Sequence, residues 1–204
     1  EHRIGGLVLF YLQSNSNSDA NDNLAAIPTR YESLSGRVTY GFKDTYFAEF
    51  NMGYNGSENF AKGKRFGFFP SIALGWLVSE EQFMEPIRNV ISKLKLRASV
   101  GTVGNDNIGG RRFAYITTIN SKANGYNWGY TGDTYRDGVQ EGEVGVGNLT
   151  WEKALKTNIG IEIGLWNELD FQLDLFKERR TSIFMQRATI PTQTGFINNP
   201  YANY

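Results

Sequence analysis

The chain has 204 residues, and its 21 basic side chains balance 21 acidic ones, so the net charge gives no reason to expect a nucleic-acid partner. It contains no cysteine and a single histidine, His2, which excludes disulfide bonds and cysteine-based metal sites, and we expect no metal or cofactor. Aromatic residues make up 14% of the chain, and 23 glycines against 5 prolines favour an all-β protein over a helical one.

The first half of the chain alternates between apolar and polar side chains in a way that predicts strands. A period of two marks residues 4–12 weakly and residues 30–43, 46–55 and 65–79 clearly. Between the first two strands lies a polar, low-complexity segment, residues 13–29, which predicts a long loop. The connection between the second strand and the third is short, which indicates a hairpin.

The second half continues the series after a charged segment, residues 80–92, that is compatible with a turn of helix. Further strands are predicted at residues 93–103, 149–165 and 169–179. Residues 104–148 are rich in glycine, asparagine, aspartate and tyrosine. We expect them to be mainly loop, with an extended excursion at 113–119.

The polar faces of these strands carry full charges. In the strand at 93–103, for example, Lys93, Lys95 and Arg97 alternate with apolar residues. Charges at such regular spacing are unusual inside a small soluble barrel, and they suit a wall with lipid on one side and water on the other. The charged side chains assigned to the wet face are Arg37, Glu49, Lys95, Arg97, Glu162, Asp170 and Asp174.

Long and short connections alternate along the chain, which in an up-and-down meander puts every long loop at one end of the sheet, as in bacterial outer-membrane barrels. The strands, at roughly 10–14 residues, are long enough to cross a bilayer when tilted. Because alternation does not say which face is wet, a soluble β-sandwich or a lipocalin-like barrel remains open. Aromatic residues near strand ends, as an interfacial girdle requires, are Tyr40, Phe42, Tyr46, Phe66, Phe68, Trp76 and Trp166.

Two blocks of sequence carry a more specific signal. The first block comprises Phe69-Pro70-Ser71, Gly75-Trp76, Ser79-Glu80-Glu81, Phe83-Met84 and residues 93–105. The second block comprises Leu149-Thr150-Trp151-Glu152-Lys153, Asn158-Ile159-Gly160 and the hairpin at 165–176, followed by Ile190-Pro191 and Thr194-Gly195. In this order the blocks resemble the SusC/RagA-type TonB-dependent outer-membrane transporters, and the resemblance covers most of residues 30–197.

The resemblance implies an antiparallel up-and-down meander of about seven to eight strands, as part of a transmembrane β-barrel of about 22 strands. Residues 1–204 would then be a partial receptor barrel domain in the bacterial outer membrane. The plug domain and the TonB box would lie upstream, outside this chain. Such transporters do no covalent chemistry, so we expect no enzyme activity.

The resemblance also implies a function and partners. The transporters import oligosaccharides or peptides together with a SusD-like surface lipoprotein, and the other partners would be the rest of the barrel with its plug, TonB and outer-membrane lipid. Two alternatives from other classes remain open. One is a structural or adhesive outer-membrane barrel without transport, and the other is a soluble carbohydrate-binding β-domain.

The long segment at 104–148 holds the candidate contact residues. Tyr126, Trp128, Tyr130 and Tyr135 are flat amphipathic rings among hydrogen-bonding groups, which suit recognition of a sugar or a peptide. They equally suit a protein interface with the lipoprotein, or packing within a compact loop. Asn105 and Asp106, at the start of the segment, complete the predicted substrate- or partner-contacting set.

Overall fold

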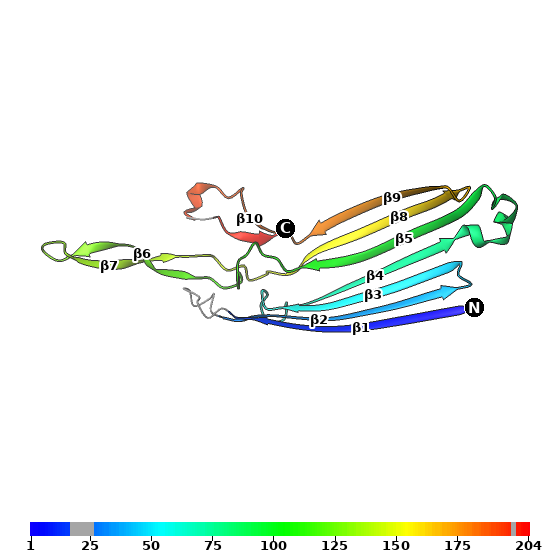
Figure 1. Cartoon of the computed structure of the whole chain (residues 1–204). Helices are drawn as coiled ribbons and strands as arrows, with labels where there is room; N and C mark the ends of the chain where they lie inside the picture. Colours follow the sequence, from blue (N-terminus) through cyan, green and yellow to red (C-terminus); the bar gives the residue numbers. More distant parts are fainter. Residues whose placement is uncertain (17–26, 197–198) are drawn as a thin grey trace.

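The computed structural model describes residues 1–16, 27–196 and 199–204, and most of it is one curved antiparallel sheet (Figure 1). The sheet has 7 strands in the order β1-β2-β3-β4-β5-β8-β9. Their bounds are β1 (His2–Asn15), β2 (Thr29–Phe42), β3 (Tyr46–Ser57), β4 (Phe66–Leu77), β5 (Ile91–Asn105), β8 (Glu152–Leu165) and β9 (Leu169–Thr181). All six strand pairings are antiparallel, which confirms the predicted all-β meander.

The short connections gather at one end of the sheet and the long ones at the other, as predicted (Figure 1). At the short end, Lys43 and Asp44 in one turn and Trp166 and Asn167 in another have φ between 52° and 56°. Two successive residues with positive φ match the twist of the flanking strands, which is why these hairpins close tightly. The predicted helical turn consists of two 3₁₀ segments, η1 (Val78–Glu80) and η2 (Gln82–Ile87).

The segment at 104–148 differs from its prediction. Within it, β6 (Ile119–Trp128) and β7 (Thr134–Glu141) pair into a separate hairpin instead of a loop. Apart from the buried Ala123, both faces of this ribbon are largely exposed, so the alternation that identifies a half-buried strand is missing from its sequence. The predicted excursion at 113–119 is also wrong, because Phe113 has a positive φ of 50° and extended structure begins only at Ile119.

Two smaller pieces complete the described part of the chain. Strands β10 (Phe184–Gln186) and β11 (Tyr201–Asn203) pair with each other near the long-loop end, and η3 (Thr192–Thr194) lies between them in the sequence. The predicted loop at 13–29 lies largely outside the described residues. No helix among the described residues is long and apolar enough to cross a membrane.

The register of the sheet sorts its side chains into two faces, which we name the apolar face and the charged face. On the apolar face one row runs across six strands through Tyr40, Ala48, Leu74, Ala98, Ile159 and Leu175. Leu74, Ile159 and Leu175 are each more than half exposed. A continuous exposed surface of this kind is rare on a soluble monomer, so it requires a covering phase or partner.

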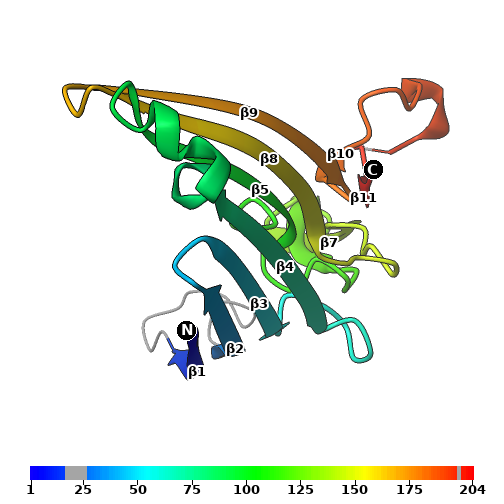
Figure 2. The ribbon, with the colours of Figure 1, turned by 90° about the vertical axis from the view of Figure 1, so that its right-hand side faces the viewer.

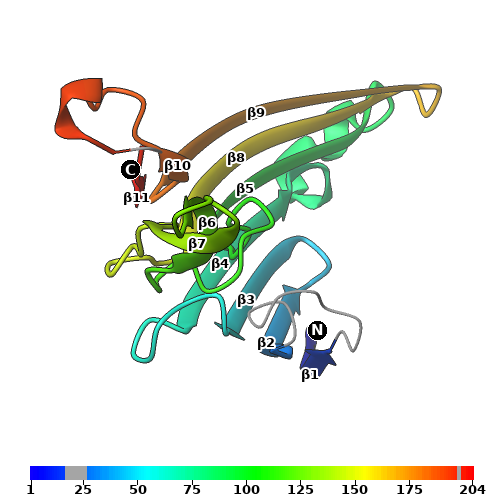
Figure 3. The same cartoon turned by 90° about the vertical axis from the view of Figure 1, so that its left-hand side faces the viewer.

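The charged face carries all seven side chains that the sequence assigns to the wet side. Arg37 bonds Glu49 across β2 and β3 at 2.5 Å. Further along, Arg97 on β5 contacts Glu162 on β8 at 3.2 Å and Asp174 on β9 at 2.9 Å. Figures 2 and 3 show that the sheet curves like a section of a wall, with β1 and β9 at its opposite edges.

Candidate contact surface at the long-loop end

The β6–β7 hairpin projects beyond the ends of the sheet strands, so its tip is the part of the described chain farthest out at this end (Figure 1). Its register pairs Tyr126 with Arg136, Trp128 with Thr134, and Asn127 with Tyr135. Residues that pair across an antiparallel ladder share a face. Tyr126 and Trp128 therefore lie on one face of the ribbon, and Tyr135 lies on the other.

Tyr126 and Trp128 form a contact of their own. Their ring centroids are 5.8 Å apart and the planes meet at 80°, an edge-to-face arrangement that aromatic pairs prefer. Tyr126 is 71% exposed and Trp128 is 60% exposed, so most of both rings faces outward. With Arg136 across the ladder from Tyr126, this face offers two flat rings and a cation to a ligand or a partner.

The other two predicted aromatics do not join this pair. Tyr130 sits in the hairpin turn and is fully exposed. Tyr135 uses its hydroxyl to accept a hydrogen bond from the backbone N–H of Gly125 at 2.9 Å. In the same turn, a hydrogen bond from the Thr131 side chain lowers the pKa of Asp133, which keeps that carboxylate charged at the tip.

Asn105 and Asp106 lie at the end of β5, well away from the hairpin tip, and their polar atoms serve the fold. Asp106 accepts a hydrogen bond from the hydroxyl of Ser57 at 2.6 Å, and its backbone oxygen accepts one from Asn59 at 3.1 Å. Asn105 donates to Glu152 at 3.2 Å. The structure therefore separates these two residues from the aromatic part of the predicted set.

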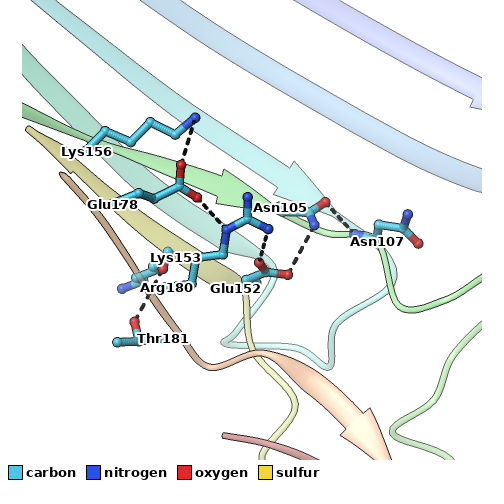
Figure 4. A network of polar contacts seen from close by, with 8 residues as sticks. All are labelled: Asn105, Asn107, Glu152, Lys153, Lys156, Glu178, Arg180 and Thr181. Atoms are coloured by element: carbon cyan, nitrogen blue, oxygen red, sulfur yellow. Dashed lines mark hydrogen bonds and ion pairs between the residues drawn. The ribbon is translucent and has the colours of Figure 1, made fainter. Parts of the chain in front are cut away.

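Asn105 also belongs to a chain of polar contacts along the charged face, which continues to the backbone N–H of Asn107 (Figure 4). Arg180 on β9 bridges Glu152 and Glu178, and Lys156 on β8 approaches Glu178 at 3.7 Å. These contacts cross from β5 to β9 and stabilise the strand ends from which the long loops leave. Among the described residues, no group of three or more acidic, histidine or cysteine side chains could hold a metal ion.

A buried cluster at the base of the loops is what the sequence analysis missed. Its members are Phe60, Phe69, Ile108, Val146, Leu149 and Trp151. Trp151 is 2% exposed, packs on Phe60 and Phe69 at 5.1 and 5.3 Å, and donates its indole N–H to the backbone oxygen of Arg65 at 3.0 Å. Phe69 shares a strand face with small residues of β4, so the alternation pattern had hidden its role.

Glycines hold the hairpin strands at close approach, which leads to a first prediction. A Cβ at Gly125 would lie 1.7 Å from the backbone oxygen of Arg136, and the ladder shifts register beside it. Gly125→Ala should force the strands apart, because backbone atoms on the facing strand have no room to move aside. Limited proteolysis of the full-length protein should then cut within residues 119–141 at least about tenfold faster.

The matched control is Gly147→Ala, because a Cβ there meets nothing within 4 Å. Its cleavage rate should equal that of the parent protein. Equal protection of the hairpin in both variants would contradict the close packing described above.

Comparisons with known proteins show which family has this architecture. No protein-family model matches the chain. The TonB-dependent receptor SusC of Bacteroides thetaiotaomicron is 36% identical over 167 residues, which is 80% of this chain and 16% of that receptor. The chain belongs to the SusC-type family of TonB-dependent receptors.

Other members of the family match the chain in the same way. Two TonB-dependent receptors of Formosa agariphila are 34% and 32% identical over 81% and 89% of the chain, covering 15% and 18% of their own lengths. The relatives are receptors and not enzymes. This SusC-type chain thus spans less than a fifth of the curated relatives it matches.

Solved structures agree on the fold of this SusC-type chain. The RagAB peptide importer in its closed-closed state superimposes with a TM-score of 0.71 at 21% identity, over 98% of this chain and 23% of that one. The RagAB peptide transporter gives a TM-score of 0.70 at 22% identity, with the same coverage. The curved seven-stranded sheet is therefore the fold found in these transporters.

Proposed function

We propose that residues 1–204 form a stretch of the barrel wall of an outer-membrane TonB-dependent importer, with the plug domain and the TonB box outside this stretch. The observation that carries the proposal is the sheet itself. It has an exposed apolar face, a charged face and two edge strands, β1 and β9, that each have one neighbour among the described strands. Unpaired strand edges are prohibitive in lipid, so the wall must continue into further strands of the same barrel.

The whole protein, on this proposal, takes up oligosaccharides or peptides and works with a SusD-like surface lipoprotein. The comparisons support this proposal, since the sheet shares the fold of the RagAB peptide importer and the chain is 36% identical to the TonB-dependent receptor SusC. The β6–β7 hairpin supports it too, because exposed rings at the long-loop end suit contact with a substrate or a surface partner. Outer-membrane lipid covers the apolar face.

The contact set for this function comprises Tyr126, Trp128, Tyr130 and Tyr135, with the Tyr126–Trp128 face at its centre. Asn105 and Asp106 stand outside this contact surface and support it indirectly, because their hydrogen bonds to Glu152, Ser57 and Asn59 hold the loop base in place. The exposure of the four rings counts against packing within a compact loop. It favours contact with a ligand or partner from outside.

Uptake by living cells tests the proposal. The full-length receptor is produced in a strain that lacks it, and uptake of labelled maltooligosaccharides and of labelled peptides is measured with and without TonB. TonB-dependent uptake of either probe supports the importer. Correct insertion in the outer membrane without TonB-dependent uptake of any probe would favour the non-transporting barrel.

A further inference from the structure

The short-turn end of the apolar face carries an aromatic row with a carboxylate set against it. Phe42, Tyr46 and Trp76 follow one another across β2, β3 and β4, with ring centroids 6.3 Å apart at each step. Tyr46 and Trp76 are nearly parallel, at 9°. Such rows occur where a membrane meets water, because the rings are apolar and their edges can bond polar groups.

Glu81 is the carboxylate, and both of its ring neighbours donate to the same oxygen. The Tyr46 hydroxyl donates to Oε1 at 2.5 Å and the Trp76 indole N–H donates to Oε1 at 3.1 Å. These two hydrogen bonds lower the pKa of Glu81, so the carboxylate stays charged at neutral pH. The charge is therefore fixed in position at the rim of the apolar face.

The charge of Glu81 lacks a close counter-ion in this part of the molecule. Among the described residues, no basic side chain lies within 4 Å of its oxygens, whereas neighbouring Glu80 pairs with Arg88 at 3.0 Å. Lys43 acts on Glu81 only at longer range, and its ammonium lies over the Phe42 ring, 5.3 Å from the centroid. The short-turn rim of the apolar face thus presents the unpaired carboxylate of Glu81 beside the rings of Tyr46 and Trp76. The ammonium group of Lys43 lies further away.

A groove runs from this rim along the apolar face. Its volume is about 750 Å³, and its lining includes Tyr46, Trp76, Ala48, Leu74 and Ala98. Ala48 and Ala98 lie on either side of Leu74 in one row of the sheet, and their short side chains hollow the surface there. The lining is almost entirely apolar, which suits a hydrocarbon chain.

We propose that this rim binds a phospholipid with an amine headgroup, held by its ammonium against Glu81 and the rings of Tyr46 and Trp76. A carboxylate beside aromatic faces recognises an ammonium group through charge and through the ring electrons. The acyl chain of this lipid occupies the groove over Ala48 and Ala98. The inference rests on the proposed membrane location of the sheet.

Native mass spectrometry of the full-length receptor tests the site. The receptor is reconstituted in nanodiscs of equal phosphatidylethanolamine and phosphatidylglycerol, released in a mild detergent, and its retained lipids are counted. We expect phosphatidylethanolamine to be enriched about fivefold over phosphatidylglycerol. Glu81→Gln keeps an oxygen for Tyr46 and Trp76 but removes the charge, so the enrichment should fall to about one.

Two further variants separate the contribution of the lipid headgroup from that of the acyl chain. Glu80→Gln is the matched control, because that carboxylate is paired with Arg88, and it should leave the enrichment unchanged. Ala98→Leu fills the groove and should lower retention of both lipids while sparing the headgroup preference.

Equal retention of the two lipids by the parent receptor, or unchanged enrichment in Glu81→Gln, overturns the site. If the receptor inserts in the nanodisc bilayer and shows no preference, this inference alone fails. If the receptor does not insert at all, the proposed membrane location fails and the lipid site falls with it.

Discussion

Replacing both Tyr126 and Trp128 with alanine is expected to reduce uptake by the full-length receptor about 30-fold. The two rings touch each other, project from the hairpin and present most of their area to the outside. Exposed aromatic pairs of this kind are typical of contact hot spots, whose truncation costs about 2 kcal/mol, or about 30-fold in affinity. Uptake of labelled probes, together with co-purification of a surface lipoprotein, measures the effect.

A control variant on the same hairpin distinguishes contact from folding. Val139→Ala removes an exposed apolar side chain of β7 without touching the Tyr126–Trp128 pair, and it should change uptake less than about twofold. The receptor level in the outer membrane must be the same in all variants. Uptake and lipoprotein binding that stay at parental levels in the double variant would remove the hairpin from the contact surface.

The variant Trp151→Ala is expected to destabilise the long-loop end by about 3 to 5 kcal/mol. Trp151 is almost completely buried between Phe60 and Phe69, so its removal opens a large cavity. It also leaves the backbone oxygen of Arg65 without the indole donor. Thermal unfolding of the purified receptor in detergent, followed by proteolysis of residues 106–150, should reveal the loss.

Trp151→Phe serves as the milder comparison, since it keeps an aromatic ring in the cluster and loses only the indole N–H and part of the volume. We expect it to cost clearly less than alanine, about 1 to 2 kcal/mol. If alanine and phenylalanine had the same small effect, the cluster would not be what stabilises the base of the loops.

The sheet could be predicted from the sequence because one face of each strand differs from the other. Leu96 and Ala98 alternate with Lys95 and Arg97, and this period of two survives in every strand of the main sheet except β1, where it is weak. The alternation of long and short connections then indicates which strand ends lie at the same end of the sheet. The residues assigned to the wet face, from Arg37 to Asp174, share one face in the structure.

The long-loop end could not be predicted in the same way. Apart from Ala123 the β6–β7 ribbon is largely exposed on both sides, so no apolar row runs along its length, and its register shifts beside Ala123 and Tyr126. The cluster around Trp151 joins Phe69 of β4 to residues of the segments at 58–65 and 106–151, which are far apart in the sequence. Such contacts depend on tertiary packing, which periodicity does not encode.

The candidate site was predicted in part. Tyr126 and Trp128 could be singled out as rings in a polar segment, but only the register reveals that they share a face and that Tyr135 lies on the other. Asn105 and Asp106 looked similar in the sequence, yet their hydrogen bonds to Glu152, Ser57 and Asn59 stay within the fold. The residue type alone does not show whether the polar atoms of a side chain are already hydrogen-bonded within the fold.

The most direct test of the central claim, that this sheet is a membrane wall, is the accessibility of spin labels along β4. This chain has no cysteine, so single cysteines can be placed in turn at Ile72, Ala73, Leu74 and Gly75 in the full receptor reconstituted in lipid. Labels at 72 and 74 should collide with oxygen dissolved in the bilayer, and labels at 73 and 75 should collide with a water-soluble nickel complex or be shielded from both. Accessibility without this alternation, or water contact on the apolar face, would contradict the account.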